Sequence, residues 1–532
     1  MIDQPSHLRR SFLSTSFELL FWVLIVGYGL LMVVGANLGP IDDHFFLSGI
    51  QIGKYHPLMI SMSLGRFFPL CAQELNIISR FTTSPAAYYA VNMTLFYILT
   101  FLLLDIIGTI TSRRTGKCII LLLIFTPGFT SAWFRLHIAD RNAFFFMVFF
   151  LYFYLQFNKR QTWTRLVLGL AMANISFYYK EPIFLMLGGF AFTHVVLEYR
   201  NSSLRARTFD SLLIMSAFIY ATIYYVVIFR HTGQQLYGDN GVAFLQRFKF
   251  NLIQYMLCDP MLLVFCIPLA FWRWARILFR KGTANPLYDS LLLGAVVYMV
   301  SFIKINLFNP WYWLPAYAFA TPALVYYIVG HGRGEAKFRF RKKLFGLATA
   351  IMVINSYPFG LHLLTFYKYL PTNYNRALDA IVADIQSRPF SERPVIYLDG
   401  LDKGNHNELY GSFKEYLIYK GLHEDRFFLP VPFESFIGNG DDTYLEPYFP
   451  KDSGDYLVLT PFGGKRQDSE YISGLYASFA CVERTNSSFA IPFPARKDLI
   501  KAFFFKFGIY RSPPSPDQRL WVWPDYSVWR KK

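Results

Sequence analysis

Charged side chains are scarce in this sequence. Asp, Glu, Lys and Arg together make up 16% of its 532 residues, whereas soluble globular chains carry about 25%. Carboxylates are the rarer sign, with 35 Asp and Glu against 52 Lys and Arg. No basic stripe accompanies a nucleic-acid-binding motif, so we expect no nucleic-acid partner. The composition excludes an ordinary soluble protein.

Cysteine is also sparse, and the spacing of the cysteines does not match a metal-binding motif. None of the five cysteines forms a C-x-x-C pair, and one of them lies in the C-terminal region: Cys71, Cys118, Cys258, Cys266 and Cys481. A disulfide framework or a thiolate metal site is therefore not expected.

Apolar and aromatic residues are abundant instead. They reach 54% and 19% of the chain, led by 56 Phe and 36 Tyr. A bilayer requires runs of about 20 apolar residues. The sequence predicts about eleven such helices, at 15–36, 87–111, 118–134, 142–157, 165–180, 183–199, 210–229, 255–272, 288–306, 313–330 and 344–366. We expect a polytopic α-helical membrane protein. No small-residue cleavage site follows the first run, which favours a retained span over a signal peptide.

Basic clusters predict the orientation of these helices. They fall in every second segment between the predicted helices, counting the segment before the first one, at 9–10, 113–117, 159–165, 200–207, 273–281 and 333–343. Because basic loops stay cytoplasmic, the N-terminus is predicted to be cytoplasmic. The segment 37–86, the loop 230–254 and the C-terminal region then share the outer side.

The sequence pattern changes from about residue 370, where long apolar runs give way to shorter helix and strand patterns. Segment 376–386 reads as an amphipathic helix, 395–398 and 456–459 as buried strands, and 408–420 as another helix. This alternation predicts a membrane module over 1–369 and a small extracytoplasmic α/β domain over 370–532. That domain has no phosphate-binding glycine fingerprint, no H-E-x-x-H and no G-x-S-x-G motif. We expect it to shape the site or dock a partner.

The sharpest local motif is the pair Asp42-Asp43, followed by His44, where the first helix should emerge on the outer side. Adjacent carboxylates near the bilayer boundary are costly unless they are solvated, paired or used. They could form a hydrophilic loop start, act as a general base, or bind a divalent cation. The loop then runs to Arg66 with the character of an interfacial segment.

Further charged and aromatic residues occur where other predicted helices reach the same side. They are Arg135, His137, Asp140, Arg141, Lys180, Glu181, Lys304, Trp311 and Tyr312. Each alone could be a snorkelling residue. Together, guanidinium and ammonium groups suit a lipid-linked phosphate, and indoles could stack on a sugar.

These residues carry a resemblance. A multispan chain with an Asp-Asp motif in its first outer loop, a Lys-Glu hairpin and a soluble C-terminal region resembles the GT-C glycosyltransferases. It looks most like the bacterial enzymes that use polyprenyl-phosphate sugars, including GtrII-like glucosyltransferases and arabinosyl- or aminoarabinose-transferring relatives. The specific motifs lie within about 37–70 and 130–182.

The resemblance implies a multi-pass protein of the bacterial inner membrane that transfers a hexose or pentose to a glycan, lipid or protein. It favours Asp42 as catalytic base with Asp43 as partner, although the sequence does not distinguish the two. It implies that Arg66, Arg135, Arg141, Lys180 and Lys304 bind the donor phosphate. His44, His137, Glu181, Trp311 and Tyr312 are the expected substrate contacts. A divalent cation is compatible with this chemistry but not required, because Arg and Lys can neutralise the phosphate.

Three alternatives remain open. A polysaccharide polymerase or ligase would use the outer loop 230–254, with Arg230, His231, Arg247 and Lys249. A transporter would show a pseudo-repeat between halves and broken helices. A phosphoryl transferase would need a metal site in the C-terminal region, where His406 and His423 are isolated.

Overall fold

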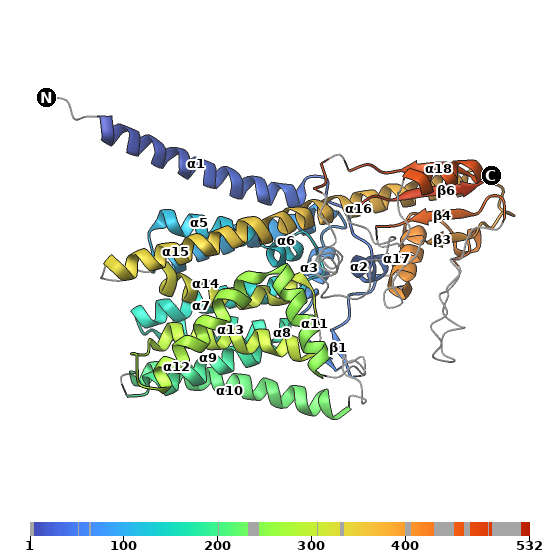
Figure 1. Ribbon diagram of the computed structural model, residues 1–532. Coiled ribbons are helices and arrows are strands. Elements are labelled where there is room, and N and C mark those ends of the chain that lie inside the picture. Colours follow the sequence, from blue (N-terminus) through green and yellow to red (C-terminus); the bar gives the residue numbers. More distant parts are fainter. Residues whose placement is uncertain are drawn as a thin grey trace.

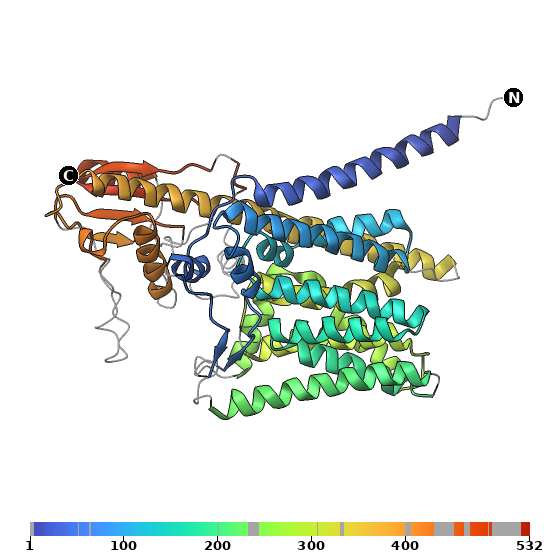
Figure 2. The ribbon, with the colours of Figure 1, turned by 180° about the vertical axis from the view of Figure 1, so that it is seen from behind.

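The computed structural model describes residues 5–51, 53–62, 65–200, 202–231, 244–305, 307–329, 335–398, 406–429, 452–461, 469–487, 489–491 and 523–532. Most of the chain up to residue 386 forms long helices that run side by side, and four strands lie together at one end of them (Figures 1 and 2). We call this end of the bundle the sheet end.

Long helices and short π-helical continuations build the bundle. They are α1 (Pro5–Val33), α4 (Pro85–Gly108), α5 (Arg113–Ile124), α6 (Pro127–Trp133), α7 (Ala139–Lys159), α8 (Trp163–Tyr179), α9 (Ile183–Glu198), α10 (Leu204–Val227), α11 (Phe244–Cys258), η2 (Leu262–Cys266), α12 (Ile267–Leu278), α13 (Pro286–Ile305), α14 (Leu314–Leu324), η4 (Val325–Val329), α15 (Glu335–Ile351), η5 (Met352–Ser356) and α16 (Tyr357–Gln386). Local chemistry starts several of them. Ser112 and Ser203, for example, accept backbone N–H bonds at the starts of α5 and α10.

Shorter elements gather at the sheet end of the bundle (Figure 1). They are α2 (Asp42–Gln51), the paired strands β1 (Ile60–Ser61) and β2 (Arg66–Phe67), α3 (Gln73–Ser79), η1 (Phe229–His231) and η3 (Pro310–Trp313). The connections α4–α5, α7–α8, α9–α10 and α12–α13 lie at the opposite end. The described parts of 37–86 and 230–254 thus share an end with the strands, as the sequence predicts.

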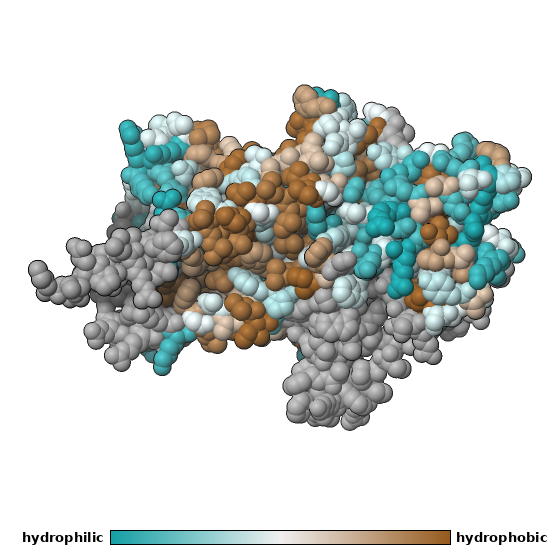
Figure 3. Space-filling view, turned by 90° about the horizontal axis from the view of Figure 1, so that it is seen from above, coloured by the Kyte–Doolittle hydropathy of each residue, from teal (hydrophilic) through white to brown (hydrophobic). Residues whose placement is uncertain are grey.

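The chain is a multi-pass membrane protein. Five described helices are long and apolar enough to span a bilayer, and a sixth span results if α5 and α6, bent by 69°, count as one. Brown hydrophobic surface covers much of the helical part, while teal hydrophilic surface covers the C-terminal end (Figure 3). Helical elements overlap all eleven predicted stretches, but the count of eleven spans is not confirmed.

The last membrane helix differs from its prediction. The stretches 344–366 and 376–386 were expected to be separate, but α16 runs without a break from Tyr357 to Gln386, and the 30 residues include Pro371. The expected boundary at 369/370 therefore lies inside one helix. One continuous helix therefore joins the bundle to the strands.

The strands of the C-terminal region form one sheet in the order β3-β4-β6-β5. These are β3 (Ile396–Leu398), β4 (Tyr456–Leu459), β5 (Phe479–Arg484) and β6 (Ser527–Lys531). β3 and β4 are parallel, and the other two pairs are antiparallel. The predicted strands at 395–398 and 456–459 are β3 and β4.

Both faces of this sheet are covered. Because strand side chains alternate, Ile396 and Val458 join the core that continues into α16, whereas Tyr397 and Trp529 pack with α18 (Ser469–Ser478). α17 (His406–Tyr419), the predicted helix at 408–420, lies against α2. The fold therefore brings a C-terminal helix directly to the Asp42-Asp43 motif.

Candidate functional site

The Asp42-Asp43 pair opens helix α2 after an unusual turn. Ile41 has a φ of 68°, a left-handed conformation that branched side chains avoid. The turn aims the backbone N–H of Gly39 at Asp43, whose Oδ2 accepts it at 2.6 Å. Asp43 is buried, whereas the Asp42 side chain is 35% exposed. The two adjacent carboxylates therefore have different environments.

Asp42 is paired with Arg135, which lies between α6 and α7. The Arg135 guanidinium donates to the Asp42 carboxylate. It also lies over two aromatic rings, with its central carbon 4.7 Å from the Trp311 centroid and 5.2 Å from that of Tyr367. Such stacking favours a cation and fixes the plane of its donors.

These groups line a cavity of about 360 Å³ at the sheet end. Its lining is Gly39, Pro40, Ile41, Asp42, Asp43, Tyr89, Phe134, Arg135, Asn309, Trp311, Tyr312, Phe366, Tyr367, Leu370 and Pro371. Five of the predicted site residues thus meet in one place: Asp42, Asp43, Arg135, Trp311 and Tyr312. A carboxylate pair, one guanidinium and aromatic walls suit a ligand that has an anionic and a sugar-like part.

Burial changes the acid–base behaviour of Asp43. Desolvation raises the pKa of its carboxyl to about 7, against the opposing effects of the Gly39 N–H and the Arg141 charge. Asp43 therefore titrates near neutral pH. This value does not follow from the sequence, where the two acids look equivalent.

Arg141 lies outside the cavity lining and supports Arg135 from behind. It is 1% exposed, and its Nη1 donates to the backbone carbonyl of Arg135 at 2.8 Å. Its Nη2 lies 3.2 Å from Glu74 Oε1. The structure places this predicted phosphate ligand where it orients the Arg135 peptide.

Two further predicted cations are engaged in ion pairs behind the cavity wall. Lys180 Nζ lies 3.1 Å from Asp140 Oδ2, and 4.4 Å from the ring centroid of Tyr312. Arg66 Nε lies 2.8 Å from Glu181 Oε1. Burial raises the pKa of the Glu181 carboxyl, but the positive charges of Arg66 and Lys180 lower it by more, so the pKa is below its usual value. Neither Arg66, Lys180 nor Glu181 lines the cavity.

The predicted histidines also lie outside the lining. His137 Nε2 is 3.2 Å from His56 Nε2, and burial is the main cause that lowers the pKa of His137 to about 3. Burial likewise lowers the pKa of His44 to about 4. Both rings are therefore neutral at neutral pH. The side chains of Lys304 and Arg247 lie outside the described residues, as do residues 232–243 of the loop 230–254. Arg230, His231 and Lys249 are exposed.

The donor set fits a divalent cation poorly. Asp42 is committed to Arg135, and Asp43 accepts from Gly39. Among the described residues no three His, Cys, Asp or Glu side chains cluster as metal ligands.

Several residues of this site were missed by sequence reasoning. Tyr89 comes from α4, and Phe366, Tyr367, Leu370 and Pro371 come from α16. They are aromatic or apolar residues of expected membrane helices, and nothing in their spacing marks them. The unbroken α16 is what carries them to the cavity.

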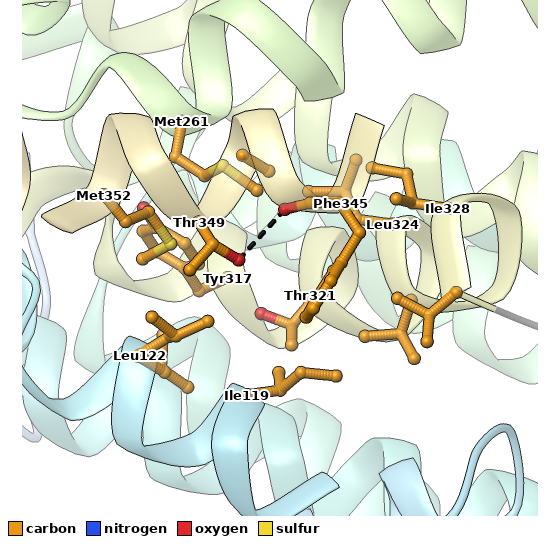
Figure 4. Close-up of a pocket in the computed structure, with 14 residues that line it drawn as sticks. Ile119, Leu122, Met261, Tyr317, Thr321, Leu324, Ile328, Phe345, Thr349 and Met352 are labelled. Carbon is orange, nitrogen blue, oxygen red and sulfur yellow. Dashed lines mark hydrogen bonds between the residues drawn. The ribbon is translucent and has the colours of Figure 1, made fainter. Parts of the chain in front are cut away.

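A second cavity holds no charged lining. It has a volume of about 60 Å³ and lies between α5, α14 and α15 (Figure 4). Ile119, Leu122, Met261 and Met352 contribute apolar walls. The Thr349 hydroxyl donates to the Phe345 carbonyl at 2.9 Å within α15. No carboxylate, histidine, lysine or arginine is among the residues that line this cavity.

Comparison with solved structures gives distant likenesses, and ArnT and AglB are two of them. ArnT from Cupriavidus metallidurans bound to undecaprenyl phosphate shares 11% identity, with a TM-score of 0.44, over 88% of this chain and 96% of that one. AglB, an oligosaccharyltransferase from Archaeoglobus fulgidus in complex with an inhibitory peptide and a dolichol-phosphate, shares 12%, with a TM-score of 0.41, over 83% and 69%. No family model and no curated protein matches.

Proposed function

We propose that this protein is an inverting glycosyltransferase that moves a hexose or pentose from a polyprenyl-phosphate donor to a cell-envelope acceptor. One observation carries the proposal: a carboxylate and a guanidinium face each other in an aromatic-walled cavity at the end of a membrane-spanning bundle. The carboxylate suits a hydroxyl proton, the guanidinium suits a phosphate, and the aromatic rings suit a sugar face.

The ion pair between Asp42 and Arg135 suggests how donor binding would make the Asp42 carboxylate available as a base. The sugar is joined to the lipid phosphate through a diester whose charge competes with Asp42 for Arg135. Donor binding would then separate the pair and leave the Asp42 carboxylate free to accept a proton. A base made available only when the phosphate is in place ties the reaction to bound donor.

The reaction itself is a single displacement. The acceptor oxygen attacks the anomeric carbon as its proton passes to Asp42, and the bond from that carbon to the phosphate oxygen breaks. The lipid phosphate leaves with the electron pair and is stabilised by Arg135. Attack opposite the leaving group inverts the anomeric centre. Asp43, bonded to Gly39, would hold the turn that presents Asp42.

The setting of the reaction belongs to the same proposal. Residues 1–369 would form the catalytic membrane module and 370–532 an α/β domain at the sheet end. The positive-inside rule applied to the basic clusters puts the sheet end outside the cytoplasm. The proposed location is the bacterial inner membrane, with glycan, lipid or protein as acceptor.

Transfer of radiolabelled sugar from a panel of polyprenyl-phosphate donors in membranes tests this proposal. The comparison needs wild type, Asp42→Asn and Asp43→Asn, with Asp105→Asn as control because Asp105 is exposed and lies outside the cavity lining. We expect transfer with inverted configuration in wild type and the control, and loss in Asp42→Asn. Undiminished transfer in both site variants would favour the polymerase or ligase alternative. Donor translocation without product would favour a transporter.

A further inference from the structure

The turn that precedes Asp42 is held by side chains from more than 300 residues away. The carbonyl of Leu38 accepts from the Tyr416 hydroxyl at 2.5 Å and from Asn375 Nδ2 at 3.1 Å. The backbone N–H of Ile41 donates to Ser412 Oγ at 2.9 Å. The polar backbone groups at both ends of the turn 38–41 are thus satisfied by α16 and α17.

The contact with Ile41 falls on the strained residue of the turn. Ile41 adopts the left-handed conformation, with φ at 68°, although its branched side chain disfavours it. Such a conformation persists only where the surroundings hold it. Ser412 is buried, and its Oγ lies 3.4 Å from the Tyr374 hydroxyl, so it is itself fixed in place.

Packing reinforces these hydrogen bonds. α17 lies directly against α2, whose first residue is Asp42 (Figure 1). Tyr416 is fully buried, with its ring centroid 4.8 Å from that of Tyr374. A shift of α17 would therefore move the turn and the start of α2 together.

We propose that Ser412 and Tyr416 are positioning residues that hold the turn 38–41 and thereby place the Asp42 carboxylate against Arg135. The C-terminal region then completes the reactive site and does not merely cover it. This inference rests on the proposed function for its kinetic consequence, but its structural part stands on the contacts alone.

The kinetic consequence is a loss of turnover more than of donor binding. Ser412→Ala leaves the Ile41 N–H without its acceptor, so the turn can relax and Asp42 can leave its place. Since a misplacement of about 1 Å can cost about 100-fold in rate, we expect kcat to fall about 10- to 100-fold. The donor KM should change less than about 3-fold, because Arg135 and the aromatic walls remain. Tyr416→Phe should have a smaller effect, since Asn375 still donates to Leu38.

A second substitution that restores the activity of Ser412→Ala distinguishes a positioning role from a simple loss of folded protein. Glycine adopts the left-handed region without a steric penalty. Ile41→Gly should therefore restore kcat of Ser412→Ala at least about 3-fold, whereas Ile41→Val, which keeps the branched side chain, should not. Lys414→Ala is the control on the same helix, because Lys414 is exposed and pairs with Glu424.

A second readout does not depend on catalysis. In full-length protein that carries Asp42→Cys and Cys481→Ser, the labelling rate of the introduced thiol by a maleimide reports how well position 42 is held; Cys481→Ser removes the exposed native thiol. Protein without Asp42→Cys gives the background. We expect Ser412→Ala to raise this rate several-fold and Lys414→Ala to leave it unchanged.

The two readouts distinguish the possible failures. If Ser412→Ala changes neither the labelling rate nor the kcat per folded molecule, the positioning role is overturned. Equal behaviour of Ile41→Gly and Ile41→Val in the Ser412→Ala protein would overturn the role of the strained turn. Faster labelling in Ser412→Ala, in a protein that transfers no sugar from any donor, would support positioning and contradict the proposed function.

Discussion

The Arg135 guanidinium donates to the Asp42 carboxylate across 93 residues of sequence. Arg135 belongs to the segment between α6 and α7, and Asp42 begins α2. This pair places a guanidinium and a carboxylate side by side inside one aromatic-walled cavity.

Replacement of Arg135 tests whether its forked donors bind phosphate. Arg135→Ala should lower kcat/KM by about 100-fold, a typical loss for a donor that stabilises developing negative charge. Arg135→Lys should recover only part of this loss, because a point charge lacks the planar fork. Arg113→Ala, at an exposed arginine on α5, is the matched control. Equal activity of Arg135→Ala and wild type would exclude Arg135 from the phosphate site.

Lys180 offers a test between phosphate binding and structural pairing. It is buried against Asp140, whose Oδ1 has no hydrogen-bond partner in the part of the chain that the structure describes. Lys180→Met should therefore destabilise the protein by about 3–5 kcal/mol, because it leaves a buried carboxylate uncompensated. Lys180→Met with Asp140→Asn should regain much of the thermal stability in detergent. If activity per folded molecule instead fell in both proteins, Lys180 would be a donor ligand, as the sequence first indicated.

The titration of Asp43 predicts a pH dependence of stability. Its folded pKa of about 7 lies above the ordinary value of 3.8, so the folded state binds more protons than the unfolded state between these values. Stability should therefore be greatest below the ordinary value and fall as the pH rises to about 7, by at most about 4 kcal/mol. The melting temperature should drop between pH 5.5 and 8.5 in wild type, and drop less in Asp43→Asn. An identical drop in the two proteins would show that Asp43 titrates normally.

Tyr367 tests the part of the site contributed by α16. Its ring lies under Arg135, with 5.2 Å between the guanidinium carbon and the ring centroid. Tyr367→Leu should raise the donor KM about 5- to 10-fold, the equivalent of about 1 kcal/mol of lost cation–π and wall contacts. Tyr369→Leu is the control two residues along the same helix, outside the lining. Similar KM values for the two variants would remove this wall from donor binding.

Much of the architecture could be predicted because its signals are local. Apolar runs of bilayer length predicted helices, and short β-rich runs such as 395–398 and 456–459 predicted β3 and β4. The pair at 42–43 stood out because carboxylates are rare beside apolar helices. These inferences need no knowledge of which segments meet.

The rest depended on contacts between distant segments. Arg66, Arg135, Arg141 and Lys180 look alike in the sequence, yet of these four only Arg135 lines the cavity. Each of the four has an acidic partner, but only the partner of Arg135, Asp42, lies in the lining. The continuity of α16 was missed because the apolar stretch 344–366 and the amphipathic segment 376–386 read as two separate helices, although α16 continues through Pro371. The contact of Ser412 with the turn could not be predicted, because it is a single hydrogen bond from the backbone N–H of Ile41 to a side chain 371 residues away.

The central claim is that Asp42 accepts the acceptor proton while Arg135 holds the donor phosphate. Single-turnover transfer of sugar from a labelled polyprenyl-phosphate donor, with donor binding measured in parallel, tests it most directly in wild type and Asp42→Asn. The account predicts that Asp42→Asn binds the donor at least as tightly, because Arg135 loses its competing carboxylate, and transfers sugar about 100- to 10,000-fold more slowly. Transfer at the wild-type rate in Asp42→Asn, or loss of donor binding in that variant, would contradict it.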